Sequence, residues 1–248
     1  MPDLLLELPT KTIDGYLALP PGTGPFPAVV VLHEAFGLNA DIRLIADRLA
    51  VAGYVAMAPD LLEGGRLACM AQAMKALQAG RGVLADVAEE VVDWLSARSD
   101  VAAGRIGAIG FCMGGGFAYL LGLTGKLSAV APNYGQPPKD LDRLEASCPV
   151  VASYGGKDKV YRKHAARVEA ALDLVGIPND VKLYPEAGHS FMNDSDGHTL
   201  IKVLGRPIIA VGYHPEAAED AWTRIHSFFT THLGPDAAAT GPGRPGRP

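Results

Sequence analysis

Short apolar runs rich in β-branched residues alternate with helical patterns along most of this 248-residue chain. Residues 28–32 (A-V-V-V-L) are continuously apolar, as expected for a strand that is buried on both faces. Residues 41–52 follow as a helix, with Ile42, Ile45 and Leu49 on one face and charged residues opposite. This alternation predicts an α/β fold with a mostly parallel, twisted sheet and helices on both faces.

The pattern continues toward the end of the chain. Two short strands joined by a turn are expected at the start, within residues 4–19. Further strands are predicted at 54–58, 106–110, 129–134, 149–154 and 181–184, and further helices at 83–97, 113–123, 161–175 and 216–232. A short helix between glycine pairs is predicted within residues 63–82, and residues 190–215 are expected to form a long connection. In such folds a ligand site belongs beyond the carboxyl ends of the strands.

The composition supports one sizeable domain. Hydrophobic residues make up 48% of the chain, which is enough for a single large core. We therefore expect one domain over residues 1–234. Residues 235–248 are polar and rich in proline and glycine, and we expect them to be disordered.

The charge and the cysteine content argue against several classes of protein. The net charge of -5 is mild and no Lys/Arg run is present, so we expect neither a nucleic-acid partner nor a membrane surface. The N-terminus lacks a signal-peptide pattern, which favours a cytoplasmic location. The three cysteines are widely spaced and form neither a disulfide framework nor a C-x-x-C zinc motif. We expect no metal and no cofactor, in a monomer or homodimer.

The turn G-F-C-M-G-G-G, at residues 110–116, lies between a predicted strand and a predicted helix. Its G-x-C-x-G pattern is that of a nucleophile elbow with cysteine in place of serine. Such a turn holds the nucleophile in a strained backbone conformation, and the N-terminus of the next helix favours a thiolate at Cys112. A small thiol packed at a tight turn is the alternative. A dinucleotide-binding loop does not fit, because this turn lacks G-x-G-x-x-G and does not follow the first parallel strand.

An acid and a histidine follow two later predicted strands. Asp158 comes just after strand 149–154, and His189 just after strand 181–184. Either residue alone fits an ordinary surface turn, but together they complete the chain order nucleophile, acid, histidine. In this interpretation Cys112 attacks an acyl carbon, His189 transfers the proton and Asp158 orients the imidazole. The backbone N–H groups of Met113 and Ala35 are the expected oxyanion-hole donors.

Five segments carry a resemblance to a known family. V-V-V-L-H-E-A-F-G-L-N, G-Y-V-A-M-A-P-D-L, I-G-F-C-M-G-G, Y-G-G-K-D and A-G-H-S-F resemble the dienelactone hydrolase family of α/β-hydrolases, over roughly residues 12–232. The resemblance implies an α/β-hydrolase fold and hydrolysis of a small-molecule carboxylic ester or lactone through a thioester acyl-enzyme. It also implies that Glu34 contacts the resting thiol and helps to deprotonate it when substrate binds. A solvated carboxylate at a strand end is the other interpretation of Glu34.

His33 precedes this glutamate, but the pair is not part of a zinc motif. H-E-x-x-H would require a second histidine at the position of Gly37. We therefore expect His33 to be a packed or hydrogen-bonded structural residue.

The substrate contacts depart from the family pattern. Members that hydrolyse dienelactone hold the substrate carboxylate with arginines, one of them shortly after the catalytic histidine, where this chain has Asn193. The candidate substrate contacts are Phe36, Arg66, Arg81, Tyr134, Phe191 and Asn193. The two arginines can also be interpreted as solvated loop charges. A neutral or differently charged ester, lactone or thioester therefore competes with dienelactone as substrate. The remaining alternatives are a thioesterase or acyltransferase with the same triad, and a non-catalytic small-molecule binding protein on the hydrolase fold.

Overall fold

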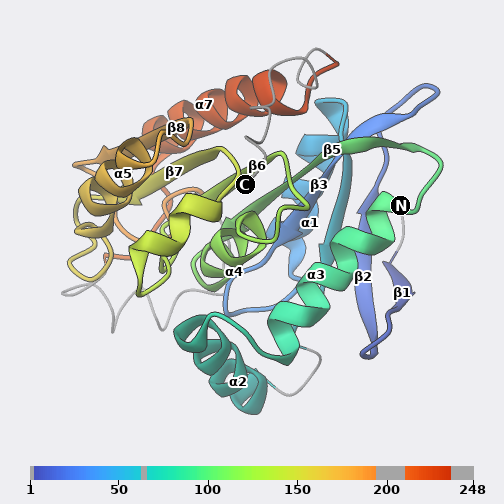
Figure 1. The fold of residues 1–248 in the computed structure, drawn as a ribbon, viewed down its shortest axis with the longest axis horizontal. Coiled ribbons are helices and arrows are strands. Elements are labelled where there is room, and N and C mark those ends of the chain that lie inside the picture. Colours follow the sequence, from blue (N-terminus) through green and yellow to red (C-terminus); the bar gives the residue numbers. More distant parts are fainter. Residues whose placement is uncertain (1–2, 63–65, 194–209, 236–248) are drawn as a thin grey trace, which may run out of the picture.

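The computed structural model describes residues 3–62, 66–193 and 210–235, except for the side chains of residues 66–68. One eight-stranded sheet, in the order β1-β2-β4-β3-β5-β6-β7-β8, runs through these residues (Figure 1). The strands are β1 (Asp3–Glu7), β2 (Thr12–Ala18), β3 (Phe26–Leu32), β4 (Val55–Pro59), β5 (Val101–Phe111), β6 (Ala129–Asn133), β7 (Val150–Gly155) and β8 (Asn179–Tyr184). The first two pair antiparallel, β2 is also antiparallel to β4, and all other pairs are parallel. The predicted α/β fold is confirmed.

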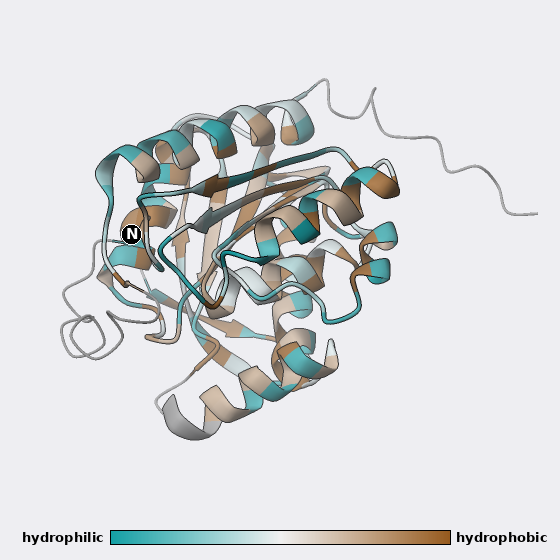
Figure 2. Ribbon diagram, turned by 90° about the vertical axis from the view of Figure 1, so that its left-hand side faces the viewer, coloured by the Kyte–Doolittle hydropathy of each residue, from teal (hydrophilic) through white to brown (hydrophobic). Residues whose placement is uncertain are grey.

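Helices cover both faces of the sheet. α1 (Ala40–Val51) and α7 (Pro215–Leu233) pack on one face, and α2 (Arg66–Ala79), α3 (Val83–Ser96), α4 (Met113–Gly122) and α5 (His164–Leu174) on the other. The run of valines in β3 explains the need for both layers. Val30 joins the core beneath α3 and α4, whereas Val29 and Val31 join the core beneath α1 and α7. In Figure 2 the central strands are mostly brown, and the surrounding helices mix teal with brown.

Several element boundaries differ from the sequence predictions. β5 begins at Val101, five residues before the predicted strand, because Phe26 of β3 pairs with Val101 across a register shift. α5 begins at His164 rather than at residue 161, since residues 159–163 form turns around Asp158. A short 3₁₀ helix, η1 (Leu141–Ala146), follows β6 and was not predicted. Residues 194–209 of the long connection and 236–248 of the tail lie outside the described residues.

The sheet has a topological switch point at β3. This strand pairs with β4 on one side and with β5 on the other, so the chain leaves it in opposite directions. Leu32 at the end of β3 pairs with Gly110 of β5. Glu34 and Cys112 therefore both lie two residues beyond the same paired position, at the carboxyl edge where an α/β sheet binds its ligand.

Candidate active site

Cys112 forms the turn between β5 and α4, with φ 52° and ψ -111°. This left-handed conformation is strained for a residue with a side chain. The flanking glycines allow the close approach that the turn needs. A Cβ at Gly110 would lie 2.0 Å from the carbonyl oxygen of Gly114, and one at Gly114 would lie 2.1 Å from that of Leu32. The turn is fixed further by the Cys112 N–H, which donates to the Asn133 carbonyl at 3.1 Å.

His189 and Asp158 form a buried pair. The Nδ1 atom of His189 lies 2.6 Å from Oδ2 of Asp158. The other carboxylate oxygen accepts the backbone N–H groups of Val160 and Tyr161, both at 3.0 Å. With both oxygens bonded and the side chain fully buried, the carboxylate can hold only one orientation of the imidazole.

The thiol of Cys112 acts electrostatically on this pair. Burial by itself would lower the pKa of His189. The negative charge of Cys112 and the hydrogen bonds to Asp158 and Cys112 outweigh that effect and raise the pKa of His189 to about 10. The structure thus joins Cys112, His189 and Asp158, which come from three separate strand ends, in one interacting group.

The loop after β3 is held by His33. Its Nε2 accepts the backbone N–H of Leu61 at 3.0 Å, so the ring proton is on Nδ1, which donates to the Glu34 carbonyl at 2.6 Å. The same carbonyl accepts the N–H of Gly37 at 3.3 Å. Because a peptide group is planar, fixing the Glu34 carbonyl also fixes the direction of the Ala35 N–H. The expected structural role of His33 agrees with this geometry.

Met113 is the first residue of α4. The first N–H groups of a helix have no acceptor within that helix, so this one is available beside the thiol. The helix dipole adds partial positive charge at the same point. The two backbone N–H groups expected to bind an oxyanion, those of Ala35 and Met113, therefore follow the ends of two neighbouring strands, β3 and β5.

The carboxylate of Glu34 is buried and accepts a hydrogen bond from the hydroxyl of Ser190. Ser190 directly follows His189 and has φ 56°, another left-handed backbone conformation. This contact ties the loop after β3 to the loop after β8. It was not foreseen from the sequence, where Ser190 had no signal beyond its place next to His189.

Two tyrosine rings enclose His189. Tyr134 packs edge-on at 5.2 Å between ring centroids, and Tyr161 lies at 5.1 Å. Burial raises the pKa of Tyr161 to about 12, with further contributions from the charges of Cys112 and Asp158. Tyr161 was also missed in the sequence, where its only signal is a position three residues after the candidate acid.

The candidate substrate contacts separate into two groups. Tyr134 and Asn193 belong to the site: the tyrosine hydroxyl donates to the Asn193 side-chain oxygen, whose amide nitrogen donates to Asp41 at 2.5 Å. Phe191 is fully buried between Tyr134 and Tyr184, with centroids 5.4 and 5.0 Å away.

The other three candidates are placed differently. Phe36 is half-buried in the turn after β3. Arg81 is exposed and lines a separate cavity of about 180 Å³ between α3 and α4, whose lining contains no other candidate residue. The side chain of Arg66 lies outside the described residues, although its backbone begins α2.

The described residues were also searched for metal-binding groups and for membrane-spanning helices. No group of three or more His, Cys, Asp or Glu side chains in this part of the chain is arranged to hold a metal ion. None of the helices in the same residues is both long and apolar enough to cross a membrane.

The sheet order and the elbow between β5 and α4 define an α/β-hydrolase. The model of the family described as "Dienelactone hydrolase family" matches residues 13–233. The chain belongs to the dienelactone hydrolase family, and it is a hydrolase of the dienelactone hydrolase-like type.

Individual relatives agree with this assignment. Proteins of Yersinia pestis and Methylorubrum extorquens, both named "Putative carboxymethylenebutenolidase", are 30% and 31% identical to this chain. These matches cover 89% and 92% of this chain, and 84% and 79% of the two relatives. The crystal structure of a dienelactone hydrolase-like promiscuous phosphotriesterase from metagenomic libraries is 25% identical, with a TM-score of 0.77. That match covers 93% of this chain and 98% of the other.

Proposed function

We propose that this protein hydrolyses a carboxylic ester or lactone of a small molecule, with Cys112 as the nucleophile. One observation carries the proposal. The only residue with a side chain in the left-handed conformation of the β5–α4 turn is the cysteine that acts electrostatically on the buried, hydrogen-bonded His189–Asp158 pair. Membership of the dienelactone hydrolase family supports the same reaction class.

In the acylation step the Cys112 thiolate attacks the carbonyl carbon, and a C–S bond forms while the carbonyl electron pair moves to oxygen. The N–H groups of Ala35 and Met113 stabilise this oxyanion. When the tetrahedral intermediate collapses, the C–O bond of the ester breaks. His189 donates its proton to the leaving alkoxide, and a thioester acyl-enzyme remains. In a lactone the alcohol formed stays attached to the acyl group.

In the deacylation step His189 is neutral and accepts a proton from water through Nε2. The hydroxide attacks the thioester carbon, and collapse of the second intermediate expels the thiolate and releases the carboxylic acid. Asp158 keeps the Nδ1 proton of His189 in place throughout, so the free ring nitrogen faces the reacting atoms.

Glu34 is the proposed thiol-activating group. Its carboxylate is buried at the same sheet edge as Cys112, and the Ser190 hydroxyl holds it there. In this proposal the carboxylate takes up the thiol proton when substrate binds, and returns it to the thiolate that deacylation expels. Ser190 then decides how readily the Glu34 side chain turns toward the sulfur.

The charges around the site favour a substrate that carries no carboxylate next to the reacting carbonyl. Burial raises the pKa of Tyr134, and the negative charges of Glu34, Asp41 and Cys112 raise it further. A second carboxylate at this position would meet like charges. The side chain of Asn193 is a neutral amide, and it already forms hydrogen bonds with Tyr134 and Asp41. It therefore does not provide a positive charge for a substrate anion. We therefore propose an ester or lactone without a carboxylate beside the reacting carbonyl, rather than dienelactone itself.

The test is hydrolysis of p-nitrophenyl acetate by wild type and by Cys112→Ala. We expect the variant to lose at least about 10³-fold in kcat/KM, since removal of a triad nucleophile typically costs this much or more. Cys148→Ala is the matched control, because burial raises the pKa of the Cys148 thiol to about 12 and leaves it unreactive. Undiminished turnover by Cys112→Ala would refute the proposal.

A panel of substrates that differ in the bond to be cleaved tests which reaction Cys112 catalyses. Small lactones and neutral aryl esters are the expected substrates, and an added alcohol acceptor separates hydrolysis from acyl transfer. An aryl phosphotriester belongs in the panel, because a protein with the same fold at 25% identity is a promiscuous phosphotriesterase.

A further inference from the structure

A second cavity, of about 250 Å³, lies beside the active site and is lined mainly by cationic and polar groups. Lys139 reaches it from the loop after β6, and Lys163 and Arg167 from the start of α5. No aspartate or glutamate is among the described residues that line it. Within that same part of the chain, none of these three cations has an ion pair or a hydrogen bond from its side chain. Unpaired cations that converge on one cavity are the usual setting for binding an anion.

His164 forms the buried wall of this cavity. The residue is only 6% exposed, and its ring packs at a tilt against those of Tyr161 and Tyr154, with 6.0 and 6.5 Å between ring centroids. No described residue forms a hydrogen bond with the imidazole. Among the described residues, the only fully buried side-chain nitrogen or oxygen without a partner is Oδ1 of Asn133. The ring nitrogens of His164 are therefore accessible, and they can form a hydrogen bond with an anion in the cavity that this residue lines.

The electrostatic environment of His164 supports the same conclusion. Burial lowers the pKa of His164, and the positive charges of Lys163 and Arg167 lower it further, opposed only by Asp158. The side chain is therefore surrounded by an excess of positive charge. An anion in the cavity would offset this charge and accept a hydrogen bond from the imidazole.

We propose that this cavity binds an anionic group of sulfate or phosphate size, through the charges of Lys139, Lys163 and Arg167 and a buried hydrogen bond from His164. This inference does not rest on the proposed ester hydrolysis, because it uses none of the atoms of Cys112, His189 or Asp158.

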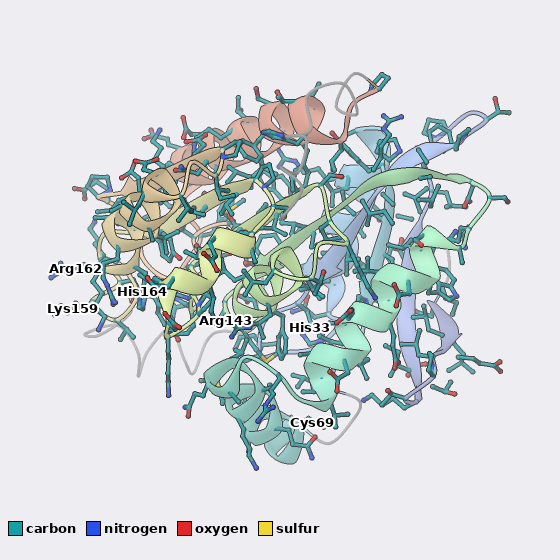
Figure 3. All side chains as sticks on the ribbon, in the orientation of Figure 1. His33, Cys69, Arg143, Lys159, Arg162 and His164 are labelled. Carbon is teal, nitrogen blue, oxygen red and sulfur yellow. The ribbon has the colours of Figure 1, made fainter. Side chains whose placement is uncertain are left out.

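The cavity nevertheless adjoins the active site. Val160, which lines it, donates its backbone N–H to Asp158. The ring of Tyr161 lies between the two histidines, 5.1 Å from His189 and 6.0 Å from His164. An anion bound here would be separated from the acid–base histidine by one aromatic ring. Figure 3 labels His164 on the same edge of the molecule as Lys159 and Arg162, whose side chains reach outward from the preceding turn.

The first experiment is calorimetric titration of the full chain with sodium sulfate, against sodium chloride of equal ionic strength. Wild type should bind one sulfate saturably, and Cys112→Ala should bind it equally well. Arg167→Ala should weaken sulfate binding by about tenfold, as expected for one charge-assisted contact. Lys139→Ala, on a different loop, should weaken it similarly. Both side chains are exposed, so neither substitution removes core packing.

Arg162→Ala is the matched control for Arg167→Ala. It removes the same charge five residues earlier, but Arg162 does not line the cavity. Sulfate affinity should stay near that of wild type. The proposal is wrong if wild type binds no sulfate saturably, or if Arg162→Ala weakens binding as much as Arg167→Ala does. The second result would mean that the general positive charge of this surface, not the cavity, attracts the anion.

A pH titration isolates the buried imidazole, because the charge of sulfate is constant over the range in which histidine titrates. Protonation of His164 adds charge and a donor, so affinity should rise as pH falls. His164→Gln should bind more weakly and remove this dependence. The charged or titratable groups that face His164 are Lys139, Lys163, Arg167, Asp158, Tyr154 and Tyr161. Lysine and arginine side chains ordinarily titrate well above this range of pH. Burial raises the pKa values of Tyr154 and Tyr161, so both tyrosines stay neutral in the same range. A pH dependence that persists in His164→Gln would contradict the proposed hydrogen bond.

Two sources of the anion can be separated kinetically. If the cavity holds an acidic group at the far end of the substrate, sulfate should compete with a sulfate-bearing aryl ester and leave a neutral aryl ester unaffected. If it holds a separate effector, sulfate should change kcat for the neutral ester. Arg167→Ala should remove either effect. If sulfate changed the kinetics of wild type and of Arg167→Ala equally, the proposed anion site would be wrong.

Discussion

The loops after β3 and after β8 each contain a buried histidine, and the two histidines have opposite electrostatic behaviour. His33 is 0% exposed and His189 is 5% exposed, so burial hardly distinguishes them. Burial is the largest influence on His33 and lowers its pKa despite its hydrogen bond to the Glu34 carbonyl. Burial also acts to lower the pKa of His189, yet its contacts with Cys112 and Asp158 raise it to about 10. The difference lies in the partners. The ring of His33 is hydrogen-bonded to neutral backbone groups, with the Asp60 carboxylate no nearer than 3.6 Å, whereas the ring of His189 is hydrogen-bonded to a carboxylate and interacts with a thiol.

The two loops therefore contribute different things to the same site. In the loop after β3, the neutral imidazole of His33 fixes the peptide group that carries the Ala35 N–H, the proposed oxyanion-hole donor. In the loop after β8, the side chain of His189 itself contributes, because Asp158 orients its imidazole for proton transfer. They meet at the hydrogen bond between Ser190 and Glu34. Equal burial, combined with different partners, yields a structural histidine and a candidate catalytic one.

The largest effect should come from removing the partner of His189. Asp158→Asn leaves Val160 and Tyr161 a side-chain oxygen to bond, but its amide can donate a proton where the carboxylate accepted one. The imidazole then loses its preferred tautomer. We expect kcat to fall by about 10²- to 10⁴-fold with little change in KM. Initial rates with an activated aryl ester measure this.

The corresponding change beside the other histidine is Asp60→Asn. The carboxylate of Asp60 lies 3.6 Å from Nε2 of His33, which already accepts a backbone N–H. Turnover should change only slightly. If the two substitutions reduced kcat equally, the distinction between the structural and the catalytic histidine would be wrong.

A smaller effect, on stability, should follow from replacing the structural histidine. His33→Leu leaves the Leu61 N–H buried without its acceptor and removes one donor from the Glu34 carbonyl. The free energy of unfolding should fall by about 1–3 kcal/mol, the cost of one unsatisfied buried group. Urea denaturation measures it.

His226→Leu is the control for that measurement, since His226 is exposed on α7. Its effect should stay within about 0.5 kcal/mol. A loss for His33→Leu no larger than for His226→Leu would show that the hydrogen bonds of His33 do not hold the loop.

Much of the fold was predictable because strand and helix periodicities were unambiguous in the core. The valine run of β3 and the amphipathic face of α1 depend on local sequence alone. The first residues of β5 were missed because Ala102, Ala103 and Gly104 have no strand pattern, and their pairing depends on β3. The position of Cys112 was predictable for a similar local reason, since only glycine fits on both sides of that turn.

The contacts between loops could not be predicted in the same way. Ser190 meets Glu34, and Asn193 meets Asp41, across more than 150 positions of sequence. Such pairs form because strand ends converge at one edge of the sheet, and no periodicity marks them. The surroundings of His164 are of this kind as well, because Lys139 comes from a separate loop. Sequence identifies the residues that follow strands, but the fold decides which of them touch.

The subtlest prediction concerns the pKa of His189 in Cys112→Ala. Removing the sulfur removes its charge and its hydrogen bond, so burial is opposed by Asp158 alone and the pKa should fall from about 10. In wild type, the raised pKa stabilises the fold fully below the ordinary histidine value of 6.5, and this stabilisation is lost as pH rises toward about 10. In the variant the loss should therefore occur at lower pH. NMR titration of the imidazole resonances measures the change. His33 is the internal reference, because its ring is hydrogen-bonded to backbone groups of Glu34 and Leu61 and not to the thiol. A pKa of His189 that is the same in both proteins would mean that Asp158, and not the thiol, keeps the imidazole charged.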